Sequence, residues 1–144
     1  MKTLILLLSV LIACSSKIEH PIQKYYSMDS LWKKNATKEE VIKSFGIEYK
    51  EAHGGIIYTN PEYKNIESGH FFDKTKKLVE QFIFLDEASL LDFKKMVPCS
   101  WSENEKKESS GHTVYTVKRG KCAEKNISYE FRPGFNRYEV RWKR

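Results

Sequence analysis

Histidine side chains are the first candidates for chemistry, because imidazole serves both as a general base and as a metal ligand. The four histidines lie far apart and show no i, i+4 pairing with one another; they are His20, His53, His70 and His112. Ser68 and His70 share one face of an expected strand, which does not give the geometry of a nucleophile and its base. His53-Gly54-Gly55 is more typical of a turn before a strand than of a phosphate-binding loop. We therefore expect no enzyme activity, no bound metal and no cofactor.

A cysteine follows a short apolar run at the amino terminus. Residues 4–12 are mostly apolar, and the run is too short to span a bilayer as a helix. Leu11-Ile12-Ala13-Cys14 resembles the lipobox of bacterial lipoproteins, whose cysteine is acylated before the signal is cleaved in front of it. The resemblance implies a signal peptide over residues 1–13 and a lipid anchor at Cys14, and Ser15 favours sorting to the outer membrane. The alternative is an ordinary secretory signal that leaves the cysteine as a free thiol.

Two further cysteines, Cys99 and Cys122, form an even pair in a chain that is expected to be exported, which indicates a disulfide. The bond closes a loop of about 23 residues and stabilises the fold by roughly 3 kcal/mol in the chain-entropy model. It ties residues 102–111, which we expect to be a polar loop, to the strands that follow. The chain has no Cys-x-x-Cys motif, which argues against a redox enzyme.

Positive charge is concentrated at the carboxyl-terminal end. The formal net charge is +6, and residues 118–144 hold nine basic side chains against three glutamates. Such a cluster favours anionic partners such as lipid head groups, lipopolysaccharide phosphates or an acidic protein, although a merely solvated basic face explains it equally well. No base-stacking motif is present, so we expect no nucleic-acid partner. The candidate anion-binding residues are Arg132, Arg137, Arg141 and Lys143.

Capping signals predict two short helices. Thr37 and Glu40 form a capping box at the start of the first helix, and Gly46 supplies a left-handed end. Asp86 is a good N-cap for the second helix, which Pro98 terminates.

The segment between the signal and the first of these helices shows little periodicity. We therefore predict a lipidated tether over residues 14–30 and a single domain over residues 31–144. A chain of 144 residues is long enough for one domain with a real core and too short for two ordinary ones.

Apolar runs predict strands over residues 55–59, 66–72 and 78–85, and the polar residues 73–77 suit a hairpin turn. Residues 78–85 are apolar on nearly both faces, as expected for a central strand that is covered by a helix. Residues 112–118 supply a further strand.

The clearest pattern is a hairpin over residues 127–143. Apolar and polar side chains alternate on both arms, and placing Arg132 opposite Arg137 puts all the apolar residues on one face. The same register sets Glu130 opposite Glu139 on the other face, where we expect neighbouring arginines to offset the repulsion.

These elements give the order helix, three strands, helix, three strands. We predict an α+β domain in which short helices pack on one face of an antiparallel meander sheet. The two halves are also compatible with a degenerate tandem repeat of a helix and three strands.

Residues 35–46, followed by the strands at residues 69–72 and 78–82, resemble small outer-membrane lipoproteins of the SmpA/OmlA type. Members of that group assist the β-barrel assembly machinery. They share an architecture with β-lactamase-inhibitor proteins, in which a helical hairpin packs on a small antiparallel sheet. The resemblance implies the same fold and a place in the outer membrane.

Two functions fit these features. The first is a non-enzymatic, lipid-anchored binding or adaptor module at the outer membrane, with its domain facing the periplasm and docking on an envelope protein, anionic lipid or lipopolysaccharide. The second is an inhibitor or immunity lipoprotein that blocks an enzyme or toxin. Aromatic residues that could form its binding surface are Tyr58, Tyr63, Phe71, Phe72 and Trp101, although most residues of this kind belong to the core.

Overall fold

The computed structural model describes residues 21–60 and 65–144. The signal peptide, Cys14, the first part of the expected tether and Tyr63 lie outside the described residues. Within the described ranges, no helix is both long and apolar enough to cross a membrane.

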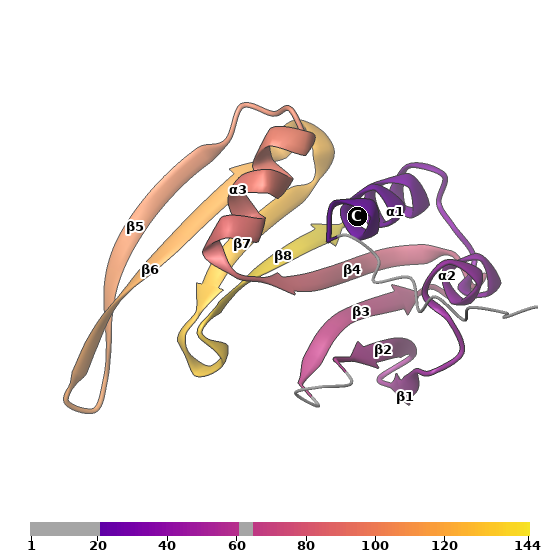
Figure 1. Ribbon diagram of the computed structural model, residues 1–144, viewed down its shortest axis with the longest axis horizontal. Helices are drawn as coiled ribbons and strands as arrows, with labels where there is room; N and C mark the ends of the chain where they lie inside the picture. The colour runs from indigo at the N-terminus through magenta and orange to yellow at the C-terminus, as the bar shows by residue number, and fades with distance from the viewer. Residues whose placement is uncertain (1–20, 61–64) are drawn as a thin grey trace, which may run out of the picture.

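The described residues form eight strands in one antiparallel sheet, in the spatial order β1-β2-β3-β4-β8-β7-β6-β5 (Figure 1). The strands are β1 (Lys50–Ala52), β2 (Gly55–Thr59), β3 (Ile66–Phe72), β4 (Leu78–Leu85), β5 (Ser102–Ser110), β6 (Thr113–Cys122), β7 (Ile127–Arg132) and β8 (Arg137–Lys143). The fold is therefore α+β with a meander sheet, as predicted. Pairing of β4 with β8 joins the two halves of the chain into a single sheet.

The helices in this part of the chain are α1 (Pro21–Lys33), α2 (Lys38–Phe45) and α3 (Glu87–Met96), with 3-10 turns η1 (Ala123–Lys125) and η2 (Pro133–Phe135). The capping box of α2 is confirmed: Thr37 Oγ1 accepts from the Glu40 amide at 3.2 Å, and the Glu40 carboxylate accepts from the Thr37 amide at 2.8 Å. Gly46 ends α2 with φ +100° and an extended ψ of 178°, instead of the left-handed helical conformation that we expected. Asp86 caps α3 by accepting from the Ser89 amide at 2.7 Å.

Helix α1 corrects the prediction of an irregular tether up to residue 30. The helix begins at Pro21, where proline fits because its missing N–H would have no helical partner. Its buried side chains recur every three or four residues and hold it on the domain; they are Tyr25, Met28, Leu31 and Trp32. The domain therefore begins by residue 21, and residue 31 is not its boundary.

Strand β5 corrects the prediction of a polar loop over residues 102–111. It pairs with β6 along its whole length, from Ser102 opposite Lys121 to Ser110 opposite Thr113. All its side chains except Glu108 are exposed, so no apolar alternation marks it as a strand. A charged edge strand of this kind protects a sheet from pairing with other chains.

The register of the β7–β8 hairpin is confirmed residue by residue. Arg132 lies opposite Arg137, and the apolar pairs are Phe131 with Tyr138, Tyr129 with Val140, and Ile127 with Trp142. These apolar side chains share one face of the sheet and are buried or half-buried.

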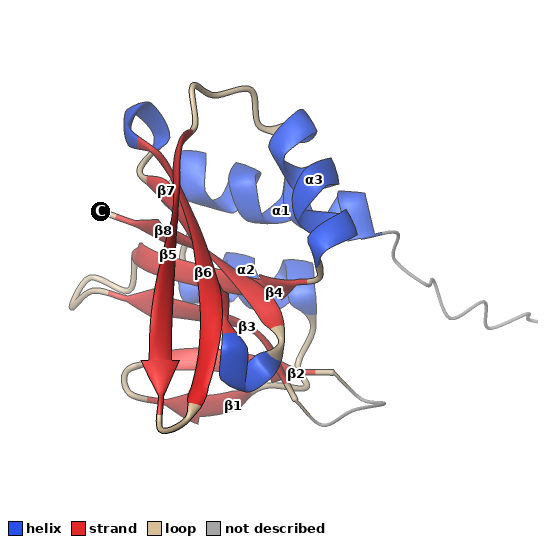
Figure 2. Cartoon of the chain, turned by 90° about the vertical axis from the view of Figure 1, so that its left-hand side faces the viewer, coloured by secondary structure: helices blue, strands red, loops and turns tan. Residues whose placement is uncertain are grey.

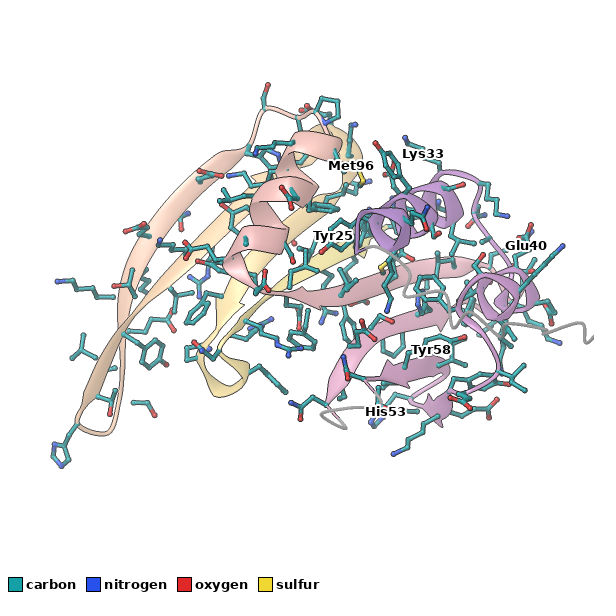
Figure 3. All side chains as sticks on the ribbon, in the orientation of Figure 1. Tyr25, Lys33, Glu40, His53, Tyr58 and Met96 are labelled. Carbon is teal, nitrogen blue, oxygen red and sulfur yellow. A yellow bond between two sulfur atoms is a disulfide. The ribbon has the colours of Figure 1, made fainter. Side chains whose placement is uncertain are left out.

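The core lies between that face and the helices. Phe93 of α3 meets Trp142 of β8 edge to face at 5.5 Å and Tyr25 of α1 at 5.9 Å. Tyr25 points toward α3 (Figure 3). Gln81 of β4 donates to the carbonyl of Met28 in α1 at 2.8 Å. Figure 2 shows α1 and α3 on one side of the strands of the second half.

The predicted disulfide between Cys99 and Cys122 is present, with Cα atoms 6.0 Å apart. It ties the connection between α3 and β5 to the last residue of β6. Because β5 has no apolar residue to bury, this strand is held to the domain by its backbone pairing with β6, by the disulfide next to it and by polar contacts of Glu103 and Glu108 with Tyr129 and Arg119.

Candidate functional site

We call the face of the sheet that points away from α1 and α3 the open face. Trp142 points toward α3, so its neighbours Arg141 and Lys143 point the other way, because side chains alternate along a strand. Figure 1 shows that the sheet arches, with β5 and β6 on one flank and β1 to β3 on the other. The open face holds two groups of side chains, one charged and one aromatic.

The charged group is a continuous chain of ion pairs that crosses five strands, and we call it the charge ladder. Its members in order are Glu108, Arg119, Glu130, Arg132, Glu139, Arg141, Glu80 and Lys143. Arg119 contacts Glu108 at 2.9 Å at one end, and Lys143 contacts Glu80 at 3.9 Å at the other. Acids and bases alternate and are equal in number, so the ladder as a whole is neutral.

In the middle of the charge ladder, arginine side chains neutralise a like-charge pair of glutamates. Glu130 and Glu139 lie opposite each other, as the hairpin register predicted. Arg132 bridges the two carboxylates at 3.3 and 3.2 Å. Arg119 contacts Glu130 at 3.1 Å, and Arg141 contacts Glu139 at 2.9 Å. The guanidinium groups thus convert a repulsive pair into part of an attractive network.

Glu139 is the most buried member of the ladder, with 8% of its surface exposed. Burial by itself raises the pKa of this carboxyl, but the hydrogen bond and charge of Arg141, assisted by Arg132, outweigh burial and hold the pKa of Glu139 below its ordinary value. The stabilising free energy that Glu139 contributes is therefore fully present at a pH above the ordinary pKa of a glutamate. It is lost as the pH falls through the lowered pKa of Glu139 in the folded protein.

The structure separates the four residues predicted to bind an anion. Arg132, Arg141 and Lys143 belong to the ladder, where acids already contact them. Arg137 stands apart from it, and no carboxylate of the described residues lies within ion-pair distance of its guanidinium. The four do not form one free basic patch.

The aromatic group, which we call the aromatic row, continues the open face toward β3. Its members are Phe71, Phe82, Phe84 and Phe135, and successive ring centroids lie 6.2, 5.6 and 4.8 Å apart. The guanidinium of Arg141 lies 5.3 Å from the ring centroid of Phe82. The aromatic row and the charge ladder therefore form one continuous surface. Strand β4 is apolar on both of its faces, although α1 and α3 cover only one of them.

Gly69 makes room for this row. A Cβ atom at Gly69 would lie 2.5 Å from a ring carbon of Phe82. We expect Gly69→Ala to displace the ring and to lower the free energy of unfolding by about 1–3 kcal/mol, as measured by urea unfolding. Gly134→Ala is the matched control, because a Cβ there meets no atom within 4 Å. Equal effects of the two substitutions would show that the ring does not depend on the glycine.

A hollow of about 660 Å³ lies on the open face over β5 to β8. Its lining includes Ser102, Asn104, Arg119, Lys121, Ser128, Glu130, Arg132, Glu139 and Arg141. These groups can donate hydrogen bonds and form ion pairs. Among the described residues, the lining of this hollow contains no histidine.

The aromatic residues named from the sequence mostly serve the core. Tyr58 is buried, and Phe72 and Trp101 pack against the core cluster. Of the named aromatic residues that the structure describes, Phe71 alone lies in the aromatic row. The sequence pattern missed Phe82 and Phe84, although their alternation with Gln81 and Ile83 was the signal that could have shown them on the opposite face to the core.

The structure places His70 in the core and His53 in a turn. His70 is buried between the rings of Phe45 at 4.8 Å and Tyr58 at 5.8 Å. Its two nitrogens and the Ser68 hydroxyl have no hydrogen-bond partner within the described residues. His53 has φ +50° and lies in the turn between β1 and β2, as expected (Figure 3).

One grouping in the described ranges has ligand atoms at metal-like spacing: Cys99, Cys122 and Glu124. Both sulfur atoms are consumed by the disulfide, so neither can act as the thiolate that a metal requires. The neighbouring carboxylate of Glu124 accepts instead from the Ser100 amide at 3.2 Å.

Comparison with known proteins finds no match among protein-family models, curated protein sequences or solved structures.

Proposed function

We propose that the chain is a non-enzymatic, lipid-anchored binding module of the bacterial envelope, and that a protein partner docks on the open face. The observation that supports this most is the continuous surface in which the charge ladder meets the aromatic row at Arg141 and Phe82. Arginine and aromatic residues contribute most of the binding energy in protein interfaces. Side chains that are already held by ion pairs also lose less conformational entropy on binding.

The balance of charge favours a protein over an anionic lipid as the partner. An anionic membrane binds clusters of unpaired lysine and arginine. In the ladder each base contacts an acid, so the surface offers alternating charges. Alternating charges suit a partner that presents a fixed complementary pattern, which a protein does and a fluid lipid surface does not.

The anchor is proposed on the lipobox resemblance at Cys14. An acylated Cys14 would hold the domain at the outer membrane, facing the periplasm, and two or more acyl chains make such anchoring stable. The resemblance to SmpA/OmlA-type lipoproteins supports the same location.

The strand order supports a degenerate internal repeat. Strands β1 to β4 in one half correspond to β5 to β8 in the other, and the two halves meet at β4 and β8. A helix, α2 or α3, precedes each set of strands. Each half would then be a helix with four strands, one strand more than the sequence pattern indicated.

A second candidate is an inhibitor of an enzyme or toxin, which the β5–β6 hairpin favours. The hairpin extends away from the rest of the sheet (Figure 1), and its tip turns at Gly111 with φ +60°. Val114, next to the tip, is 67% exposed. An exposed hairpin of this kind can enter the cleft of an enzyme.

Photo-crosslinking of the full chain in cells tests the proposal. A crosslinking residue at Ser128, on the open face, is expected to capture a specific protein. The same residue at Lys95, exposed on α3, is the matched control and is expected to capture none. Capture of an envelope component supports the adaptor, and capture of a lytic enzyme or toxin supports the inhibitor.

The anchor is tested on the same material by mass spectrometry of the peptide that begins at Cys14. We expect a diacylglycerol thioether, and we expect Cys14→Ser to release the protein from the membrane fraction. Equal capture at Ser128 and Lys95 would contradict the docking face, and an unmodified thiol would contradict the anchor.

A further inference from the structure

Charge in the hollow of the open face is not balanced, although the charge ladder is. The bases of its lining are Arg119, Lys121, Arg132 and Arg141, and the acids are Glu130 and Glu139. The other carboxylates that contact Arg119 and Arg141, those of Glu108 and Glu80, are not part of the lining. The hollow therefore carries more positive than negative side chains.

Lys121 supplies one of the two excess positive charges, and among the described residues it is the base of this lining that has no carboxylate partner. Its side chain is exposed, and no carboxylate of the described chain lies within ion-pair distance of its ammonium group. On β5 and β7 it is flanked by Ser102 and Ser128, which lie directly opposite it in the two strand pairings. An ammonium group between two hydroxyl-bearing residues can donate to an acidic group, and both hydroxyls can add further donors.

The shape of the open face restricts what can reach this lysine. The sheet arches so that β5–β6 and β1–β3 form its flanks (Figure 1), and the hollow is lined by residues of the β5 to β8 half. A flat membrane surface meets the edges of an arch first. A protruding loop of a folded protein can reach into a hollow of about 660 Å³.

We propose that the hollow receives a carboxylate from an acidic loop of the partner protein. This inference rests on the proposed docking of a protein on the open face. Lys121 forms the ion pair, Arg119 supports it from the same face of β6, and the hydroxyls of Ser102 and Ser128 donate to the remaining carboxylate oxygens. The anion-binding role expected for the carboxyl-terminal basic cluster thus moves from Arg137 and Lys143 to Lys121.

Titration with hexaglutamate tests the inference. The acylated full-length protein in non-ionic detergent is labelled with ¹⁵N, and amide shifts are followed at low salt. We expect the largest shifts at Ser102, Lys121 and Ser128. The lysine-rich turn at residues 74–77 is the internal control, because its exposed lysines would attract the peptide by charge alone.

Two variants with the same loss of charge sharpen the result. Lys121→Ala is expected to weaken hexaglutamate binding by about three- to fivefold, the effect of one exposed ion pair, and Lys76→Ala is expected to leave it unchanged. Equal weakening by both variants, or shifts confined to residues 74–77, would overturn the inference. Competition by vesicles of phosphatidylglycerol at the same amides would assign the hollow to lipid phosphate and would also overturn it.

The two proposals fail separately. Capture of a protein from Ser128 without hexaglutamate binding in the hollow leaves the docking face intact and removes the acidic loop. Hexaglutamate binding at Lys121 without any capture from Ser128 removes the protein partner.

Discussion

Acidification from pH 6.5 to about pH 4 is expected to lower the free energy of unfolding by about 3 kcal/mol through His70 alone. The imidazole is fully buried, and burial lowers its pKa from 6.5 to about 4. The side chain of Gln81 acts in the opposite direction and raises the pKa of His70. The charge of Lys24, whose ammonium group is paired with Glu67 at 2.6 Å, lowers this pKa further.

The sign follows from proton uptake. The unfolded chain binds a proton at His70 below pH 6.5, whereas the folded chain keeps the ring neutral until about pH 4. The unfolded state therefore gains the more protons in this interval, and stability falls as the pH falls. Well above pH 6.5 the imidazole is neutral in both the folded and the unfolded state, so His70 adds no pH dependence to the free energy of unfolding.

His70→Phe isolates the effect. The substitution keeps an aromatic ring between Phe45 and Tyr58 and removes nitrogens that have no hydrogen-bond partner among the described residues. We expect the variant to be at least as stable as the wild type at pH 7 and to lose the slope between pH 6.5 and 4. Urea unfolding at half-unit pH steps measures it, with His112→Gln at an exposed position as the control. Parallel profiles for wild type and His70→Phe would refute the assignment.

Removal of the disulfide is expected to cost roughly 3 kcal/mol, because the bond closes a loop of 23 residues. The suitable variant is Cys99→Ser with Cys122→Ala, since Cys122 is fully buried and a serine there would add an unpaired hydroxyl. The loss should be concentrated in β5, which is exposed on both faces.

Two measurements check this expectation. The urea midpoint of the double variant should fall and should equal that of the reduced wild type. Amide hydrogen exchange should accelerate in β5 more than in β3, which lies in the other half of the sheet. An unchanged midpoint would mean that the β5–β6 hydrogen bonds are sufficient to hold the edge of the domain.

Prediction from the sequence succeeded where local pattern decides the structure. The register of β7 and β8 follows from alternation that buries Tyr138, Val140 and Trp142 together. The α2 capping box follows from the spacing of Thr37 and Glu40. In each case the residues that determine the structure are a few positions apart.

Prediction failed where the deciding contact is distant or has no apolar signature. Strand β5 is polar on both faces, so only its pairing with β6 reveals it. The charge ladder needs Glu80 beside Arg141, which depends on the pairing of β4 with β8 across half the chain. Helix α1 did carry a signal, the spacing of Tyr25, Met28 and Trp32, and the nearby proline and lysines obscured it.

The place of β8 has a consequence for how the molecule is made. This strand is the last of the described strands along the chain, yet it occupies the middle of the sheet, hydrogen-bonded to β4 and β7. The last residue of β8 and the residue after it contact both halves, since the amide of Lys143 donates to the carbonyl of Asn126 and that of Arg144 to the carbonyl of Val79. Until these residues emerge, β4 has a bare edge and the two halves are not joined. The eight-stranded sheet is therefore completed only after β8 has been synthesised, because β4 and β7 both need it as a neighbour.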